Sequence, residues 1–105
     1  MTGLTFGLRV PDFPVDGTTH GRAFAEQIKA YIAAAGPAYE YLFVSDHFHP
    51  WPRWQDVATD VHECWTTICY LAAAFPDKHI GSIVMAVGYR NPALVAKMAV
   101  TLQTW

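Results

Sequence analysis

Two kinds of apolar pattern alternate along the chain. Short continuous apolar runs predict buried strands, and these lie at residues 4–10, 39–45 and 80–87. Apolar residues that recur every three or four positions predict helices, from about residue 19 or 20 to 35, from about 60 to 75, and from 91 onward. Regular alternation of strand and helix favours right-handed crossovers and a parallel sheet. We therefore expect an α/β fold made of three strand–helix units.

The expected helices carry start and stop signals. Gly36-Pro37 ends the first helix and Pro76 follows the second. Asn91-Pro92 favours the start of the third, because Asn caps a helix and Pro suits its first position. The residues expected to face the core are Phe24, Ile28 and Ile32 in the first helix, Val61, Cys64, Trp65, Ile68, Ala72 and Phe75 in the second, and Leu94, Val95, Met98 and Leu102 in the third.

Composition narrows the class of protein. Hydrophobic residues make up 52% of the 105 residues and aromatics 14%, which argues against disorder. Only 7 residues are Lys or Arg, so we expect no nucleic-acid partner. The sequence has no signal peptide and no apolar stretch long enough to span a membrane, so we expect no membrane partner. Cys64 and Cys69 point about 140° apart on one expected helix and cannot pair, which favours a reduced, cytoplasmic protein.

Reactive side chains follow the second expected strand. The run from Ser45 to Trp51 reads Ser-Asp-His-Phe-His-Pro-Trp and opens a loop of about fourteen residues, which is long for a compact domain. In a barrel of parallel strands, catalytic groups lie at the carboxyl ends. His47 can exchange a proton near neutral pH, or it is a loop histidine bonded to backbone. Asp46 either caps a turn or contacts a ligand, and Trp51 either packs along the loop or lines a site.

Residue types that bind metals are present, but their spacing matches no zinc pattern. These residues are His47, His49, His62, Glu63 and Cys64. His62 and Cys64 would face different ways on a helix, so we expect no metal site. Arg90 is expected to cap or pair near the end of the third strand, and no glycine-rich phosphate loop occurs.

The order of these motifs resembles the start of the bacterial-luciferase-like family of flavin and deazaflavin oxidoreductases. The resemblance spans nearly the whole chain, and it rests on the order and spacing of the motifs rather than on any single one. The matching segments are Pro11-Asp12-Phe13, Val44-Ser45-Asp46-His47-Phe48, Glu63-Cys64-Trp65-Thr66-Thr67, Leu71-Ala72-Ala73-Ala74, Gly81-Ser82-Ile83-Val84 and Tyr89-Arg90-Asn91-Pro92-Ala93-Leu94-Val95-Ala96-Lys97. The run Ser45–Phe48 followed by Pro50-Trp51 is most similar to the branch that uses the deazaflavin coenzyme F420, which includes glucose-6-phosphate and secondary-alcohol dehydrogenases.

The resemblance implies a (β/α)8 TIM barrel, of which residues 1–105 would form a truncated N-terminal portion with the first three units. It implies an oxidoreductase that transfers a hydride between a small organic substrate and coenzyme F420 or a flavin such as FMN. It also implies a homodimeric full-length protein. The segments that would hold the cofactor phosphate, and the glutamate that those dehydrogenases use beside the histidine, are not in this sequence.

The resemblance also assigns site residues. His47 would be the acid/base partner of hydride transfer, and Trp51 an aromatic that shields the reacting centre. A cis peptide is expected at Ile83–Val84, behind the cofactor ring, and the alternative there is a plain buried strand. Ala86 departs from relatives that offer a hydroxyl to the cofactor. The expected cofactor-binding residues are Asp46, Ser82, Ile83, Val84 and Ala86.

Three functions remain open at this point. The first is hydride transfer with F420 or FMN, and the second is an FMN-dependent monooxygenase in which reduced flavin activates oxygen. The third is an inactive truncated fragment or an interaction module that keeps the fold. We expect the 105 residues alone not to form a stable, active monomer, and the sequence does not name the substrate.

Overall fold

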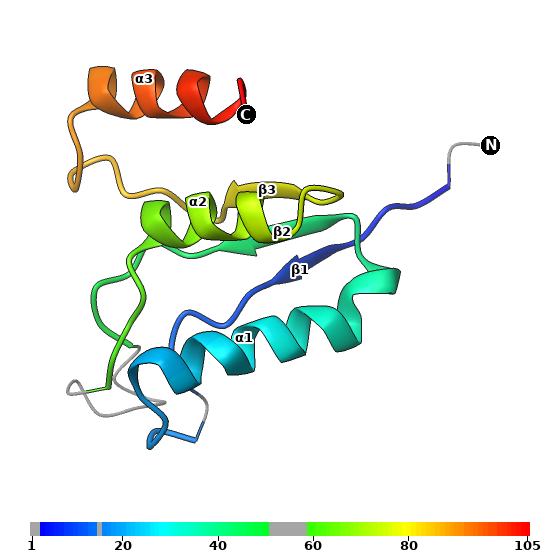
Figure 1. The fold of residues 1–105 in the computed structure, drawn as a ribbon. Coiled ribbons are helices and arrows are strands. Elements are labelled where there is room, and N and C mark those ends of the chain that lie inside the picture. The colour runs from blue at the N-terminus through cyan, green and yellow to red at the C-terminus, as the bar shows by residue number, and fades with distance from the viewer. Residues whose placement is uncertain (1–2, 15, 51–58) are drawn as a thin grey trace.

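A computed structural model describes residues 3–14, 16–50 and 59–105 (Figure 1). The described parts form one sheet of three strands in the order β1-β2-β3, with both neighbouring pairs parallel. The elements in chain order are β1 (Gly7–Arg9), α1 (Gly21–Ala35), the 3₁₀ helix η1 (Gly36–Ala38), β2 (Tyr41–Val44), α2 (Cys64–Ala74), β3 (His79–Ser82) and α3 (Pro92–Leu102). The predicted α/β class and the parallel pairing are therefore confirmed. The structure shows three adjacent parallel strands, and a closed barrel is not shown.

One face of the sheet carries the core. Leu8, Leu42 and Ile80 lie opposite one another across the three strands, and alternate positions point to the same side. Helices α1 and α2 both pack on this side, so they cover one face, as a right-handed parallel fold requires. The buried residues of the sheet are Leu8 in β1, Val10 just past β1, and Leu42 and Val44 in β2. Those of the helices are Phe24, Ile28 and Ile32 in α1, and Cys64, Ile68 and Leu71 in α2.

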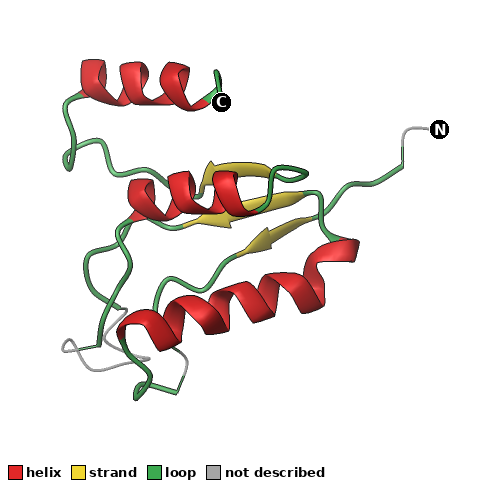
Figure 2. Cartoon of the chain, viewed as in Figure 1, coloured by secondary structure: helices red, strands yellow, loops and turns green. Residues whose placement is uncertain are grey.

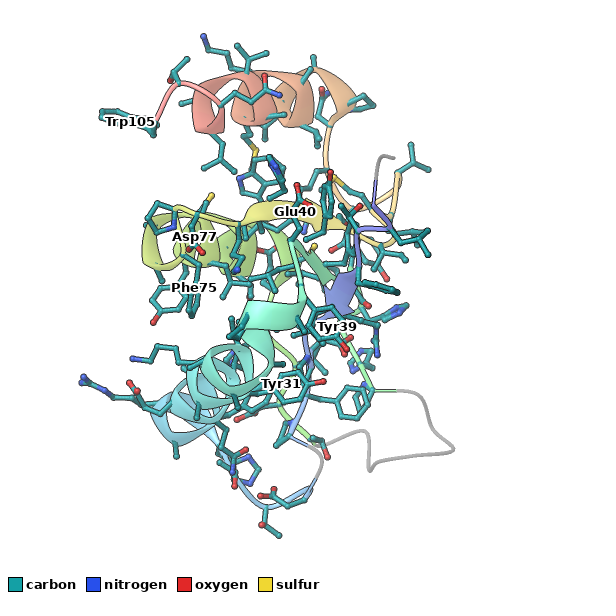
Figure 3. All side chains as sticks on the ribbon, turned by 90° about the vertical axis from the view of Figure 1, so that its right-hand side faces the viewer. Tyr31, Tyr39, Glu40, Phe75, Asp77 and Trp105 are labelled. Carbon is teal, nitrogen blue, oxygen red and sulfur yellow. The ribbon has the colours of Figure 1, made fainter. Side chains whose placement is uncertain are left out.

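Helix α3 is placed differently from the other two. It lies beyond α2 on the side away from α1, and the order of the three helices is the same in the perpendicular view (Figures 1 and 3). None of its residues is buried, and it contacts the core through the partly buried Leu102. The expectation that Leu94 faces the core was wrong, since its side chain is exposed. Trp105, just past this helix, is 99% exposed and projects away from the rest of the molecule (Figure 3).

The opposite face of the sheet is built around one aromatic ring. Phe43 on β2 lies between Gly7 on β1 and Gly81 on β3. A Cβ atom added at Gly7 would lie 2.4 Å from Cε2 of Phe43, whereas one added at Gly81 would lie 3.6 Å from the ring. Tyr41, two residues earlier on the same face, has its ring nearly parallel to that of Phe43, with centroids 6.2 Å apart. Glycine at position 7 therefore leaves room for the ring over β1.

Most elements are shorter than the sequence prediction. Strand β1 spans Gly7–Arg9 rather than residues 4–10, and β2 spans Tyr41–Val44 rather than 39–45. Strand β3 ends at Ser82 rather than residue 87, because β2 has already ended at Val44, the partner of Ser82. The last bond of this pair runs from the Ile83 N–H to the Val44 carbonyl at 2.9 Å. Helix α2 begins at Cys64 rather than near residue 60. Within the described residues, no helix is both long and apolar enough to cross a membrane.

Candidate functional site

The three strands point the same way, so the segments that follow them meet at one edge of the sheet (Figure 2). Asp46 follows β2, and its Oδ2 accepts a hydrogen bond from the backbone N–H of Ala86, in the segment after β3, at 2.9 Å. This bond joins residues 40 positions apart in sequence. The segments that follow β2 and β3 therefore meet at this edge of the sheet.

A buried ion pair lies at this edge. Arg90 donates from Nη1 to Oδ2 of Asp46 at 2.7 Å and from Nη2 to Oδ1 at 3.0 Å. The Asp46 side chain is only 1% exposed and that of Arg90 13%. The hydrogen bonds from Arg90 lower the pKa of Asp46 below its ordinary range and outweigh the opposing effect of burial, while the same contact raises the pKa of Arg90. Both groups are thus held charged, and the pairing expected for Arg90 is present.

Glu63 extends the ion pair to the start of helix α2. Its carboxylate accepts from the backbone N–H groups of Trp65 at 3.1 Å and Thr66 at 2.7 Å, so it caps the helix. It also accepts from Nη2 of Arg90. Burial raises the pKa of Glu63, but the hydrogen bonds from Thr66, Arg90 and Trp65 together outweigh burial and lower it to about 2. One guanidinium therefore links the end of β2, the segment after β3 and the first turn of α2.

The half-buried His47 lies directly after Asp46, between this ion cluster and an aromatic contact. Phe48 stacks on Tyr89 with ring centroids 4.0 Å apart and planes 11° from parallel. Each ring is close in sequence to one member of the ion pair: Phe48 lies two residues after Asp46, and Tyr89 lies directly before Arg90. The segments after β2 and β3 are thus connected twice, once by buried charges and once by exposed aromatic rings.

A second polar cluster ties the end of β1 to the end of β2. Arg9 donates from Nε to Oγ of Ser45 at 2.8 Å and from Nη2 to Oδ1 of Asp12 at 2.9 Å. The backbone carbonyl of Asp12 accepts from the N–H of His62 at 3.0 Å. Oδ2 of Asp12 is buried and has no partner among the described residues. The sequence analysis did not single out Arg9, although its alternation with Leu8 on a short strand was a signal that it faces away from the core.

Comparison with known proteins decides the family. A family model described as luciferase-like monooxygenase matches residues 4–105. The chain belongs to this family. The family resemblance expected from the motifs is confirmed. Membership of this family indicates an oxidoreductase. No curated protein and no solved structure matches the chain.

Three of the predicted cofactor-binding residues, Ser82, Ile83 and Val84, lie at the end of β3 and directly after it. The peptide between Ile83 and Val84 is cis, as expected. These two side chains are 48% and 68% exposed. Ser82 instead faces the helix side, where its Oγ lies 3.5 Å from Sγ of Cys64. Trp51 lies outside the described residues, and the roles expected for all of these residues stay predictions.

The family's deazaflavin or flavin cofactors have a flat ring and a phosphate, and the described residues fit these two parts unequally. Ile83 and Val84 present exposed apolar surface beside the Asp46-His47 segment, which suits one side of a flat ring. Arg9 and Arg90, the two arginines at this edge, both pair with carboxylates. The described edge therefore fits a ring and offers no arginine for a phosphate.

Proposed function

We propose that the protein carrying this chain transfers a hydride between a small organic substrate and coenzyme F420 or a flavin. The observation that carries the proposal is the convergence of two segments at one sheet edge, in a chain of the luciferase-like family. One segment brings the imidazole of His47, and the other brings the exposed apolar pair Ile83 and Val84. Catalytic groups of parallel barrels lie at this end of the strands.

His47 is proposed as the acid/base group. When bound, the cofactor supplies the site that takes up or gives back the hydride. If the substrate is an alcohol, its hydroxyl must lose a proton as its carbon loses a hydride, and the imidazole of His47 accepts that proton. In the reverse direction, His47 returns the proton to the carbonyl oxygen of the substrate. Trp51 is proposed to keep water away from the reacting carbon.

Four residues are proposed to contact the cofactor ring: Ser82, Ile83, Val84 and Ala86. Asp46, which the sequence also assigned to the cofactor, is proposed to belong to the same edge through its bond to the N–H of Ala86. Ile83 and Val84 would supply apolar contact through their exposed side chains. Ser82 and Ala86 would contribute through the backbone, since the Ser82 hydroxyl lies against Cys64 and Ala86 has no polar side-chain group.

A second candidate, an FMN-dependent monooxygenase, is favoured by the description of the family itself. In that case the bound flavin would supply the reducing power for oxygen activation, and His47 would exchange protons with the substrate or with water. The substrate would again be a small organic molecule. An inactive fragment or interaction module with the same fold is the third candidate, and it predicts that neither cofactor binds.

Separate titrations with F420 and FMN test the proposal, using the purified protein that carries these residues. Saturable binding of one cofactor is expected, and binding of neither would overturn the proposed function. Oxygen uptake with reduced FMN, measured against anaerobic reduction of F420 by candidate alcohols, separates the two enzymatic candidates.

His47→Ala tests the proton-transfer role. We expect turnover to fall by about 10²–10⁴-fold, the usual contribution of a positioned acid/base group, with cofactor affinity nearly unchanged. His49→Ala is the matched control, because His49 is an exposed histidine two residues along the same segment. Equal turnover in the two variants would assign proton transfer to another group.

A further inference from the structure

We infer that Arg90 is a positioning residue, and that Asp46 acts on the cofactor site through Arg90 and Ala86 rather than by touching the cofactor. The effect on cofactor binding rests on the proposed function. The effect on the positions of His47 and Ala86 rests on the contacts alone. It assigns a role to a cluster of three side chains: Asp46, Glu63 and Arg90.

The first argument is that the Asp46 carboxylate is already engaged. Both of its oxygens accept from Arg90, and Oδ2 also accepts from the N–H of Ala86. With a side chain only 1% exposed, Asp46 has almost no surface left for a ligand. A carboxylate that is buried and bidentately paired is held in one geometry, which suits a group that positions others.

The second argument is the side of the sheet on which the cluster lies. Glu63 caps α2, the helix that packs on the face carrying Leu42 and Val44, and it shares a guanidinium with Asp46. Asp46 therefore points toward the helices. Ile83, the neighbour of Ser82, exposes its side chain, while the Ser82 hydroxyl faces Cys64 of α2. A flat ligand resting on the exposed Ile83 and Val84 would have the backbone between it and the Asp46 carboxylate.

The third argument is what Arg90 connects. Through Asp46 it holds the residue before His47, and through the same carboxylate it fixes the N–H of Ala86. Asn91, the next residue, caps α3 through bonds to the N–H groups of Ala93 and Leu94. Loosening Arg90 would therefore change the spacing between His47 and the segment after β3, which is the spacing that a bound ring must match.

A double-mutant cycle with Asp46→Asn and Arg90→Lys tests the inference in the full protein. Arg90→Lys keeps the charge but loses the planar two-nitrogen contact. Each single variant should weaken cofactor binding by roughly tenfold or more, and the double variant should be no weaker than the worse single one. If Asp46 touched the cofactor independently of Arg90, the two effects would add, and that result would overturn the inference.

Two controls separate positioning from general loss of stability. Arg22→Lys makes the same chemical change at an exposed position on α1 and should leave cofactor binding unaltered. Ile68→Val removes a methyl group from the buried core without touching the cluster. If Ile68→Val weakened cofactor binding as much as Arg90→Lys at temperatures where both are folded, the role of Arg90 would be merely structural.

Amide hydrogen exchange gives a readout that needs no cofactor. In Arg90→Lys and in Asp46→Asn, the Ala86 N–H should exchange faster and the NMR signals of the His47 ring should move. The Val10 N–H, bonded to the Phe43 carbonyl at 2.8 Å in the same sheet, should keep its rate. Unchanged exchange at Ala86 would refute the positioning role even if the wild-type protein bound neither F420 nor FMN, whereas that lack of binding alone would refute only the proposed function.

Discussion

The contact between Gly7 and Phe43 makes a quantitative prediction about the sheet. In Gly7→Ala the new methyl carbon would lie 2.4 Å from Cε2 and 2.9 Å from Cδ2 of Phe43, far inside normal contact distance. Overpacking of this kind costs about 1–3 kcal/mol, because the ring must leave its rotamer or the strands must separate. Replacing a glycine also stabilises by about 0.4–1 kcal/mol, through the lower entropy of the unfolded chain. The clash is larger, so we expect a net loss of about 1–2 kcal/mol.

Gly81→Ala is the matched control on the other side of the same ring. Its added Cβ would lie 3.6 Å from Phe43, which is ordinary contact, so no clash opposes the entropic gain. We expect this variant to be neutral or slightly stabilised. The two variants add the same methyl group to neighbouring strands and differ in their distance from one ring.

Urea unfolding of the purified protein measures both effects. With a slope of about 2 kcal/mol per molar urea, a loss of about 1–2 kcal/mol lowers the midpoint by roughly 0.5–1 M. In a protein that already carries Phe43→Leu, Gly7→Ala should lower the free energy of unfolding by less than it does in the wild type. The smaller leucine side chain leaves room for the added methyl group. Equal midpoints for Gly7→Ala and Gly81→Ala would show that the ring does not constrain β1 as described.

Two further predictions follow from the charged cluster and from the exposed apolar surface. Asp46 and Glu63 have pKa values below their ordinary range in the folded protein, and that of Glu63 is about 2. Their contribution to stability is therefore fully present above about pH 4–5 and is lost as the pH falls toward these folded-state pKa values. Thermal melts from pH 7 to pH 3 should therefore show a steeper decline for the wild type than for Arg90→Met, and parallel curves would contradict the assignment. The 105-residue chain produced alone should self-associate for two reasons. Among the described residues β1 and β3 each have an unpaired edge, and a cavity of about 620 Å³ between α2 and α3 is lined by Trp65, Met98 and Leu102 among others. Size-exclusion chromatography with a thermal melt checks this, and a sharply melting monomer that binds deazaflavin would show the prediction to be wrong.

Local signals in the sequence were sufficient for the architecture. The apolar centres of the strands and the periodic stripes of the helices predicted three parallel strand–helix units, because each signal is contained within a few residues. Asn91-Pro92 marked the start of α3 for the same reason, since a cap bonds to the first turn of its own helix. The cis peptide at Ile83–Val84 and the family came from the order of motifs along the chain.

The start of α2 shows where local reasoning was insufficient. Glu63 caps this helix, although glutamate is not among the residues preferred at that position. A second hydrogen-bond donor, Arg90, lies 27 residues away and shares the carboxylate. Sequence periodicity alone extended the helix back to about residue 60, because it carries no information on a partner contributed by a later segment.

Only the tertiary structure decided which polar groups meet. The sequence marked Asp46 and His47 as reactive and expected Arg90 to pair nearby, but the partner of Arg90 is set by the register of β2 against β3. That register places Val44 opposite Ser82, so β3 stops there and the N–H of Ala86 reaches Asp46. It also turns the Ser82 hydroxyl toward Cys64, on the helix side of the sheet. A shift of one residue would send each of these side chains to the other face, and no local pattern in this chain specifies the register to that accuracy.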